Sequence, residues 1–145
     1  MKKILILLSL INVLLIGNTS SANQLIPSST TDVWEHHINA WVHRDLTEIT
    51  SDYSADSILI INGQLFRGPE KIKNVFNQLF KIFDRGNNRI DPVLNFDRII
   101  YITWHFQPYN NNEFYGTDTF IIENGKIAVQ TIASPLYDYF PVKIN

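Results

Sequence analysis

Apolar residues recur at helical spacing near the start of the chain. Positions i, i+3, i+4 and i+7 of one stretch are large and mostly apolar, which predicts a helix with one buried face. These positions are Trp34, His37, Ile38 and Trp41. Thr31 and Asp32 come just before them and are good N-cap residues, so we expect the helix to begin there.

Two further helices are predicted before residue 84. A short helix would open at Asp45, which has the capping-box spacing to Glu48. Its apolar face would hold Leu46, Ile49 and Tyr53. A longer helix would open at Pro69, which suits the first helical position because it lacks an N–H. One face of this helix is fully apolar and should pack on a large surface: Ile72, Val75, Phe76, Leu79, Phe80 and Phe83.

The remaining pattern is that of strands. Asn62-Gly63 and Asn124-Gly125 are strong two-residue hairpin signals, and Pro92 indicates an edge strand or a bulge. Four late segments are rich in β-branched and aromatic residues: 89–96, 98–106, 113–123 and 126–134. Helices grouped against an antiparallel meander predict an α+β domain, in which a curved sheet and the helices that close it leave a cavity between them.

The first 22 residues read as a separate segment. Two lysines precede a 13-residue apolar run, Ile4 to Ile16, and small residues up to Ala22 follow it. This order predicts a secretory signal peptide cleaved near Ala22, and hence an exported protein without stable membrane insertion after cleavage. An uncleaved anchor is the alternative, although a membrane span needs about 20 apolar residues. Residues 23–31 would be a flexible lead-in and 32–145 the folded domain.

Composition excludes several classes of function. Without Lys2 and Lys3 the chain has 10 basic and 14 acidic residues, so nucleic acid is not an expected partner. It has no Cys, which excludes thiol chemistry and thiolate metal sites. No phosphate loop or dinucleotide motif is present, and His36 and His37 point about 100° apart on a helix. We therefore expect no cofactor and no metal.

Three segments carry a resemblance to a known family: "HINAWVHRDLTEITSDYSADSILI", "GPEKIKNVFNQLF" and "GTDTFIIENGKI". Together they resemble the nuclear transport factor 2-like superfamily and, within it, the SnoaL-like group. The resemblance implies a cone-shaped α+β fold with a ligand cavity, often a homodimer through its sheet. It does not decide the activity, because this fold hosts enzymes, binding proteins and scaffolds. The predicted signal peptide argues against nuclear transport.

The resemblance also suggests functional positions. In ketosteroid isomerases, which belong to this superfamily, a helix tyrosine and a strand acid hold an oxyanion while a second acid abstracts a proton. The tyrosine position falls on His37. The proton-abstracting position falls on Ile61 or Asn62, where no carboxylate is present, so that reaction is not expected. The strand acid falls at Thr117 or Asp118, near a strand Asp that serves as acid/base in SnoaL-like cyclases, so Asp118 is the best candidate.

The strand pairing that a two-residue turn would set suggests a partner for Asp118. If Asn111-Asn112 is a two-residue turn, His105 lies directly opposite Asp118, with Cβ atoms about 5 Å apart. Facing inward, the two would form a His–carboxylate dyad in an apolar cone; facing outward, they would be a surface ion pair. A slip of one residue would send them to opposite faces. The same face would also carry Tyr101 and Phe120.

The sequence thus predicts a cone that binds a small apolar or aromatic molecule, with possible cyclase- or isomerase-like acid/base chemistry. The candidate catalytic residues are Asp118, His105 and His37, of which His37 has a second interpretation as a buried core histidine. The candidate ligand-binding residues are Trp34, Trp41, Tyr53, Tyr101 and Phe120. The alternative is a non-catalytic domain that only binds a ligand or dimerises.

Overall fold

The computed structural model describes residues 29–143, which form an α+β domain as predicted. The predicted signal peptide lies outside this range. In chain order the elements are α1 (Thr30–His43), α2 (Leu46–Ser51), β1 (Tyr53–Ile61), β2 (Gln64–Arg67), α3 (Pro69–Phe83), β3 (Gly86–Phe96), β4 (Ile99–Pro108), β5 (Phe114–Glu123), β6 (Lys126–Ala133) and α4 (Leu136–Tyr139). No described helix is long and apolar enough to cross a membrane.

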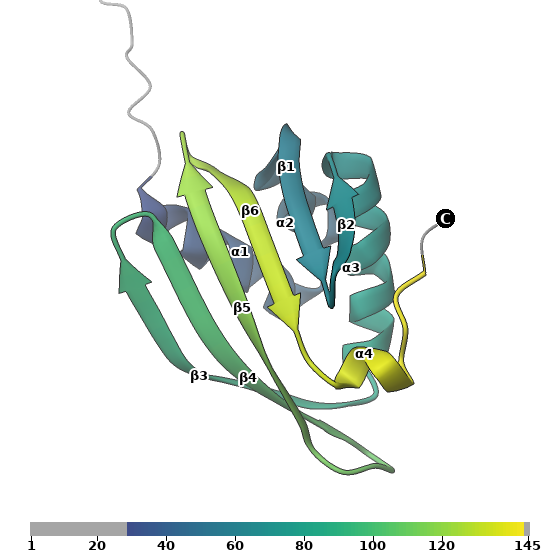
Figure 1. Cartoon of the computed structure of the whole chain (residues 1–145). Coiled ribbons are helices and arrows are strands. Elements are labelled where there is room, and N and C mark those ends of the chain that lie inside the picture. Colours follow the sequence, from purple (N-terminus) through teal and green to yellow (C-terminus); the bar gives the residue numbers. More distant parts are fainter. Residues whose placement is uncertain (1–28, 144–145) are drawn as a thin grey trace, which may run out of the picture.

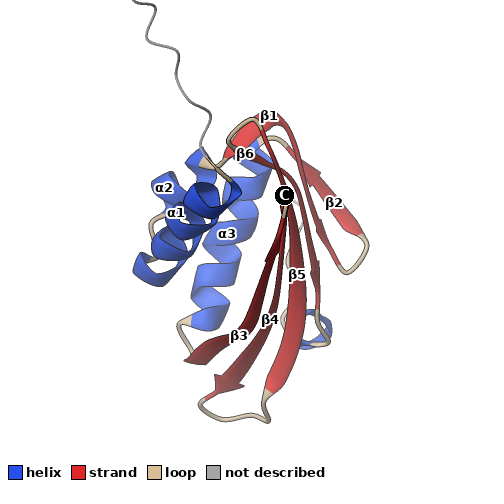
Figure 2. Cartoon of the chain, turned by 90° about the vertical axis from the view of Figure 1, so that its left-hand side faces the viewer, coloured by secondary structure: helices blue, strands red, loops and turns tan. Residues whose placement is uncertain are grey.

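The strands form one curved six-stranded sheet, ordered β2-β1-β6-β5-β4-β3 (Figure 1). All neighbouring pairs are antiparallel except β1 and β6, which run parallel. Helices α1, α2 and α3 lie on one side of this sheet, and no described helix covers the middle of its other side (Figure 2). The sheet therefore has an inner face that packs on helices and an outer face that is open.

Helix α1 begins earlier than the sequence pattern indicates. Its N-cap is Ser29, whose side chain accepts a hydrogen bond from the Asp32 N–H, while the Asp32 carboxylate accepts one from the Ser29 N–H. The predicted cap at Thr31 and Asp32 is therefore wrong, because Asp32 is the third helical residue of a capping box. Residues 30 and 31 of the predicted lead-in are likewise helical.

The chain reverses sharply after α1. Arg44 adopts a left-handed conformation with φ of 55°, and the Asp45 side chain accepts hydrogen bonds from the Thr47 and Glu48 N–H groups. The Arg44 guanidinium lies over the Trp41 ring, 4.8 Å from its centroid, and donates to Asp84 at the end of α3. This short turn lays α2 back along α1. Tyr53, which the sequence pattern placed on the short helix, instead opens β1.

Helix α3 supplies most of the helical side of the core. All six residues of its predicted apolar face are buried. Phe83 packs against Phe106 with ring centroids 4.6 Å apart and against Trp104 at 5.4 Å. Both predicted Asn-Gly hairpins form, between β1 and β2 and between β5 and β6. Pro92 lies in the edge strand β3, where the register with β4 shifts between Ile90 and Val93.

The predicted β4–β5 turn is wrong. Five residues, 109–113, connect the two strands, so His105 pairs with Tyr115, and Asp118 pairs with Ile102. The pairing differs from the prediction by three positions, an odd number, so His105 and Asp118 lie on opposite faces. Even-numbered residues of both strands are buried on the inner face, and odd-numbered residues form the outer one.

Gly116 sits under the largest side chain of the inner face. It pairs with Trp104, and a Cβ at Gly116 would lie 2.2 Å from Trp104 Cζ2. Only a residue without a side chain leaves room for this indole, which is itself 4% exposed.

We expect Gly116→Ala to lower the free energy of unfolding by about 1–3 kcal/mol, because the extra methyl overpacks a buried indole that cannot move away easily. Chemical denaturation followed by circular dichroism measures this change. Thr117→Ala, on the outer face of the same strand, is the control and should cost well under half as much. Equal stability of Gly116→Ala and wild type would contradict the close packing.

Candidate active site

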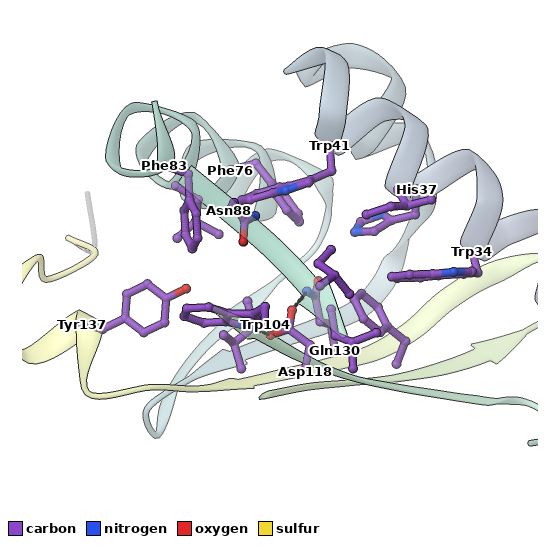
Figure 3. A pocket seen from close by; sticks show the side chains of 16 residues that line it. Trp34, His37, Trp41, Phe76, Phe83, Asn88, Trp104, Asp118, Gln130 and Tyr137 are labelled. Carbon is purple, nitrogen blue, oxygen red and sulfur yellow. Dashed lines mark hydrogen bonds between the residues drawn. The ribbon is translucent and has the colours of Figure 1, made fainter. Parts of the chain in front are cut away.

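A pocket lies between the helices and the inner face of the sheet (Figure 3). It contains about 450 Å³ of empty space, including its open mouth. Most of its wall is aromatic or aliphatic, and Trp34 and Trp41 of α1 are half-buried at its edge. The polar side chains in the wall are few: His37, Asn88, Asp118, Gln130 and the Tyr137 hydroxyl. Such a wall suits a ligand that is apolar over most of its surface.

Asp118 is the acid of the pocket. It projects from β5 and is 7% exposed. Trp104 Nε1 donates a hydrogen bond to one of its carboxylate oxygens and Gln130 Nε2 donates to the other, both at 2.8 Å. Gln130 is held in turn by Tyr53, whose hydroxyl donates to Gln130 Oε1. Neighbouring strands thus fix the carboxylate in one orientation.

Burial shifts the ionisation of Asp118. Loss of hydration raises its pKa from 3.8 to about 6, although the hydrogen bonds from Trp104 and Gln130 oppose the shift. Burial, and then the nearby Asp118 carboxylate, raise the pKa of the Tyr137 hydroxyl well above 10.0, so this tyrosine stays protonated. Asp118 can therefore exist both as acid and as carboxylate near neutral pH, which suits a group that transfers protons.

His37 faces the pocket from the opposite side, on α1 (Figure 3). Its Nδ1 donates to Asp52 Oδ2 at 2.9 Å, since a carboxylate can only accept. The residue is 4% exposed, and its ring lies edge-on to Phe76 and Phe120, with centroids 5.7 and 5.2 Å away. Nε2 has no hydrogen-bond partner within residues 29–143. An Asp that fixes Nδ1–H leaves Nε2 as the basic atom available to a ligand.

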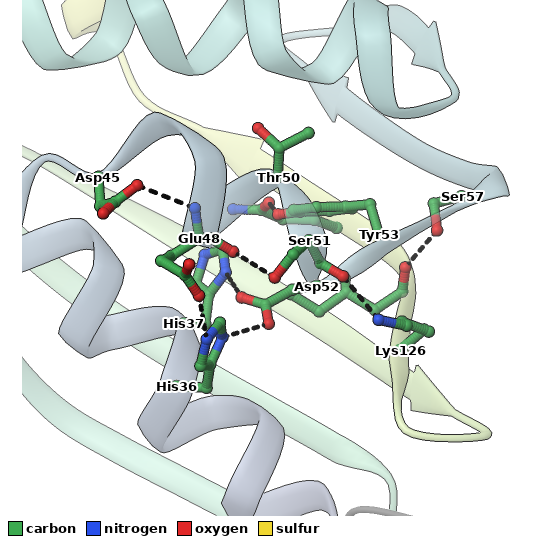
Figure 4. Close-up of polar contacts among 12 residues, drawn as sticks. His36, His37, Asp45, Glu48, Thr50, Ser51, Asp52, Tyr53, Ser57 and Lys126 are labelled. Atoms are coloured by element: carbon green, nitrogen blue, oxygen red, sulfur yellow. Dashed lines mark hydrogen bonds and ion pairs between the residues drawn. The ribbon is translucent and has the colours of Figure 1, made fainter.

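The α1–α2 reversal explains this contact. At a rise of 1.5 Å per residue, α1 extends about 10 Å from His36 to His43, and the six residues of α2 extend about 9 Å in the opposite direction. Asp52, the C-cap of α2, therefore returns to the level of His36 and His37. Figure 4 shows both rings converging on its carboxylate.

His36 takes the other oxygen of Asp52. Its Nδ1 lies 2.6 Å from Asp52 Oδ1 and its Nε2 lies 3.1 Å from Glu48 Oε2. Both ring nitrogens thus face carboxylates, so both donate when the ring is protonated. Burial lowers the pKa of His36, but the Asp52 and Glu48 carboxylates outweigh it and the pKa stands above its usual value. No group of three possible ligands among the described residues is placed to hold a metal ion.

Another polar group lies near the α4 end of the pocket. Asn88 Oδ1, from β3, is buried and accepts no hydrogen bond from a described residue. Tyr137, from α4, lies against Trp104 with ring centroids 6.4 Å apart and lines the same pocket. An unpartnered buried acceptor is costly unless something donates to it. A ligand hydroxyl or amide N–H could do so.

The predicted site residues divide into two groups. The pocket is lined by His37, Asp118, Trp34, Trp41 and Phe120. His105, Tyr101 and Tyr53 do not line it. Of these, His105 and Tyr101 belong to the outer face because of the β4–β5 register, and His105 Nδ1 lies 3.5 Å from Glu113 Oε2. Tyr53 is buried behind the wall, where it supports Gln130. The predicted His105–Asp118 pair is therefore wrong.

Sequence reasoning missed the partners of both ionisable groups. Asp52 has a signal: it follows the short helix that folds back on a His-His pair. For Gln130 and Trp104 the only sequence signal is their place in the alternation of inner-face and outer-face residues along a strand. For Asn88 and Tyr137 the sequence gives no signal. Asn62 is one of the two positions considered for a catalytic acid. Its Nδ2 donates to the Ser134 carbonyl, and its Oδ1 accepts from the Ser134 N–H. The other, Ile61, is a buried core residue.

Comparison with known proteins agrees with this architecture. The model of the SnoaL-like domain matches residues 34–130. The chain belongs to the SnoaL-like family. No curated protein matches it in sequence.

Solved structures support the same fold. One is an NTF2-like protein of unknown function from Cytophaga hutchinsonii, at 10% identity and a TM-score of 0.64, covering 80% of this chain and 98% of that one. A steroid delta-isomerase from Pseudomonas aeruginosa has 14% identity and a TM-score of 0.64, covering 72% and 78%. A proposed SnoaL-like polyketide cyclase from Shewanella denitrificans has 12% identity and a TM-score of 0.59, covering 74% and 90%. At these identities the likeness concerns the fold alone.

The pKa of Asp118 predicts a pH effect on the stability of this SnoaL-like domain. The folded state binds the Asp118 proton more tightly than the unfolded state, so the stabilisation is complete below pH 3.8 and is lost as the pH rises through about 6. The loss amounts to about 3 kcal/mol. In Asp118→Asn we expect this decline to be absent. Its amide can still accept from Trp104, and the Gln130 amide can turn over to accept from it.

Denaturant titrations at pH 4 to 8 measure the difference between the two proteins. Asp91→Asn, at an exposed position of β3, is the control and should follow the wild type. If the stabilities of the wild type and Asp118→Asn changed in the same way with pH, the raised pKa of Asp118 would be contradicted.

Proposed function

We propose that this SnoaL-like domain binds a small, mostly apolar carbonyl compound in its pocket and transfers a proton on it. One observation carries the proposal: His37, which Asp52 holds from behind, and the buried acid Asp118 lie on the wall of the same apolar pocket. The steroid delta-isomerase and the proposed polyketide cyclase that share the fold act on ligands of this general kind by their names. The N-terminal pattern supports action after export.

His37 is the proposed base. Asp52 holds its Nδ1–H, which leaves the Nε2 lone pair for a C–H next to the ligand carbonyl. The electron pair of that bond moves to the carbonyl oxygen and gives an enolate, while the proton stays on His37. Asp52 then faces an imidazolium and stabilises it. A base held in place in this way contributes about 10²–10⁴-fold to a rate.

Asp118 is the proposed acid. In its protonated form it can donate to the developing oxyanion while Trp104 and Gln130 donate to its two oxygens. Above the Asp118 pKa of about 6 the group becomes a carboxylate and repels an oxyanion. The proposed reaction is therefore favoured on the acid side of neutrality. Return of the proton to another carbon would give an isomerisation.

The pocket wall indicates what kind of ligand fits. Trp34, Trp41 and Phe120 offer flat apolar surfaces, and Asn88 offers an acceptor. A planar ring system with a ketone and a separate hydroxyl would satisfy all of them. Pure binding without turnover is the alternative, and the same experiment distinguishes the two.

Deuterium exchange tests proton transfer directly. We expect the wild-type protein to speed exchange of the α-hydrogens of 2-tetralone in D₂O, as followed by proton NMR. His37→Gln should lose about 100-fold or more of the added rate, because glutamine is no base. Asp118→Asn should lose about tenfold and should no longer slow down above pH 6, since its amide donates at every pH.

The matched control is His43→Gln, which removes an exposed histidine of the same helix that bonds only the Asn39 carbonyl. It should exchange at the wild-type rate. A wild type that binds 2-tetralone, seen as chemical-shift changes, without faster exchange would leave the binding alternative. Equal exchange rates in all variants would exclude His37 and Asp118 from the step.

We also propose that a second copy of the chain covers the outer face of the sheet. The centre of this face is uncharged and half-buried, formed by Tyr101, Thr103, Thr117, Thr119 and Val129. In a twofold dimer each residue of this patch lies near the same residue of the other copy or near the neighbours of that residue. An uncharged patch can therefore pack against itself without charge repulsion. No described helix covers it.

We expect the wild type to sediment as a dimer and Thr119→Lys to sediment as a monomer, because the lysines of two copies would be buried close together. Thr47→Lys, an exposed position of α2, is the control and should remain dimeric. Sedimentation velocity over a concentration series measures both. A monomeric wild type at high micromolar concentration would refute the interface.

A further inference from the structure

His36 and His37 are neighbours in sequence but occupy different environments. The His36 side chain is 42% exposed and meets solvent, whereas the His37 side chain is 5% exposed and lines the pocket. The Asp52 carboxylate, 7% exposed, is the only described group that forms hydrogen bonds with both rings. Each ring bonds a different oxygen of it (Figure 4).

We propose that His36 is a positioning residue for the pocket. As a cation it holds Asp52 in place and offsets the charge of this carboxylate. Because His36 meets solvent, its protonation follows the solvent pH and affects His37 through the shared carboxylate. This inference rests on the proposed function of His37 and adds a residue to it. Protonated His36 donates to Asp52 and Glu48 at once. Neutral His36 has one N–H and can serve only one of them.

The consequence for His37 follows from the charge on Asp52. When His36 is a cation, the carboxylate is partly compensated and binds a second imidazolium less well. When His36 is neutral, the full charge of Asp52 favours protonation of His37. The two rings therefore titrate as a coupled pair, and the coupling is reciprocal. The reactivity of His37 would therefore depend on the solvent pH through His36 and Asp52, although the His37 side chain itself is buried.

The other charged groups around the pair are few and come from several elements. Glu48 of α2 faces His36, and Lys126, at the start of β6, donates to the Ser51 carbonyl next to Asp52. Tyr53 of β1 lies edge-on to His37, with ring centroids 5.9 Å apart. Across the pocket β5 contributes Asp118, while α3 contributes only the apolar Phe76 to the His37 ring. Among residues 29–143, Asp52 is thus the one direct ionic partner of His37.

Ring-nitrogen NMR of the full domain tests this coupling without any ligand. The sequence has 4 histidines, so each single variant also assigns one signal. In His36→Gln we expect the His37 titration midpoint to rise by roughly half to one pH unit, because a compensating cation is gone. His43→Gln, on the same helix, should leave the His37 midpoint unchanged.

A second variant separates charge from packing. His36→Arg keeps a permanent cation that can reach Asp52, so the His37 midpoint should return to within about 0.2 unit of the wild type. If His36→Gln leaves the midpoint unchanged, the inference is overturned. An equal rise in His36→Arg and His36→Gln would also overturn it, because loss of packing would then be the cause.

The outcome is independent of catalysis. Failure of 2-tetralone exchange would sink the proposed function while the histidine titrations could still confirm the coupling. In an active protein, His36→Gln should shift the acid limb of the exchange–pH profile upward by the same half to one unit, and His36→Arg should restore it. Should His36→Gln fail to fold, His36→Asn removes the same cation and should also raise the His37 midpoint.

Discussion

The register of β4 against β5 is the constraint on which the site depends. Pairing Trp104 with Gly116 gives the indole space over a residue without a side chain, and it turns Asp118 to the inner face. The same indole then donates to that carboxylate. A shift of β5 by one residue against β4 would turn Asp118 to the outer face, where His105 lies, and leave Trp104 opposed to a side chain. Packing and chemistry thus select the same register.

Two layers of the fold bring the ionisable groups together. The sheet supplies Asp118 with its donors, and the α1–α2 reversal supplies His37 with Asp52. Asp52 holds His37 from behind the pocket wall, whereas Trp104 and Gln130, which hold Asp118, are themselves part of the wall. Burial of a charge is unfavourable for stability, and a raised pKa is its direct expression. A domain that only needed a core would gain from an apolar residue at this position.

Membership of the SnoaL-like family leaves the chemistry open. The acid that ketosteroid isomerases use after the first strand has no equivalent here, since Asn62 clasps the Ser134 backbone instead. A histidine occupies the helix position, and its partner Asp52 comes from the end of the next helix. The proposed base thus lies on a helix rather than a strand, while the acid stays on the sheet.

The sequence by itself determined local structure: the two Asn-Gly hairpins and the start of α3 at Pro69. In β4 and β5 polar and apolar residues occur on both faces, so the sequence left open whether the faces that carry Asp118 and His105 are buried. Only the tertiary structure decided the exact offset, which depends on how the 109–113 loop closes. It also decided that Asp52 lies between His36 and His37, since a contact across a helix reversal depends on the turn geometry and packing of both helices.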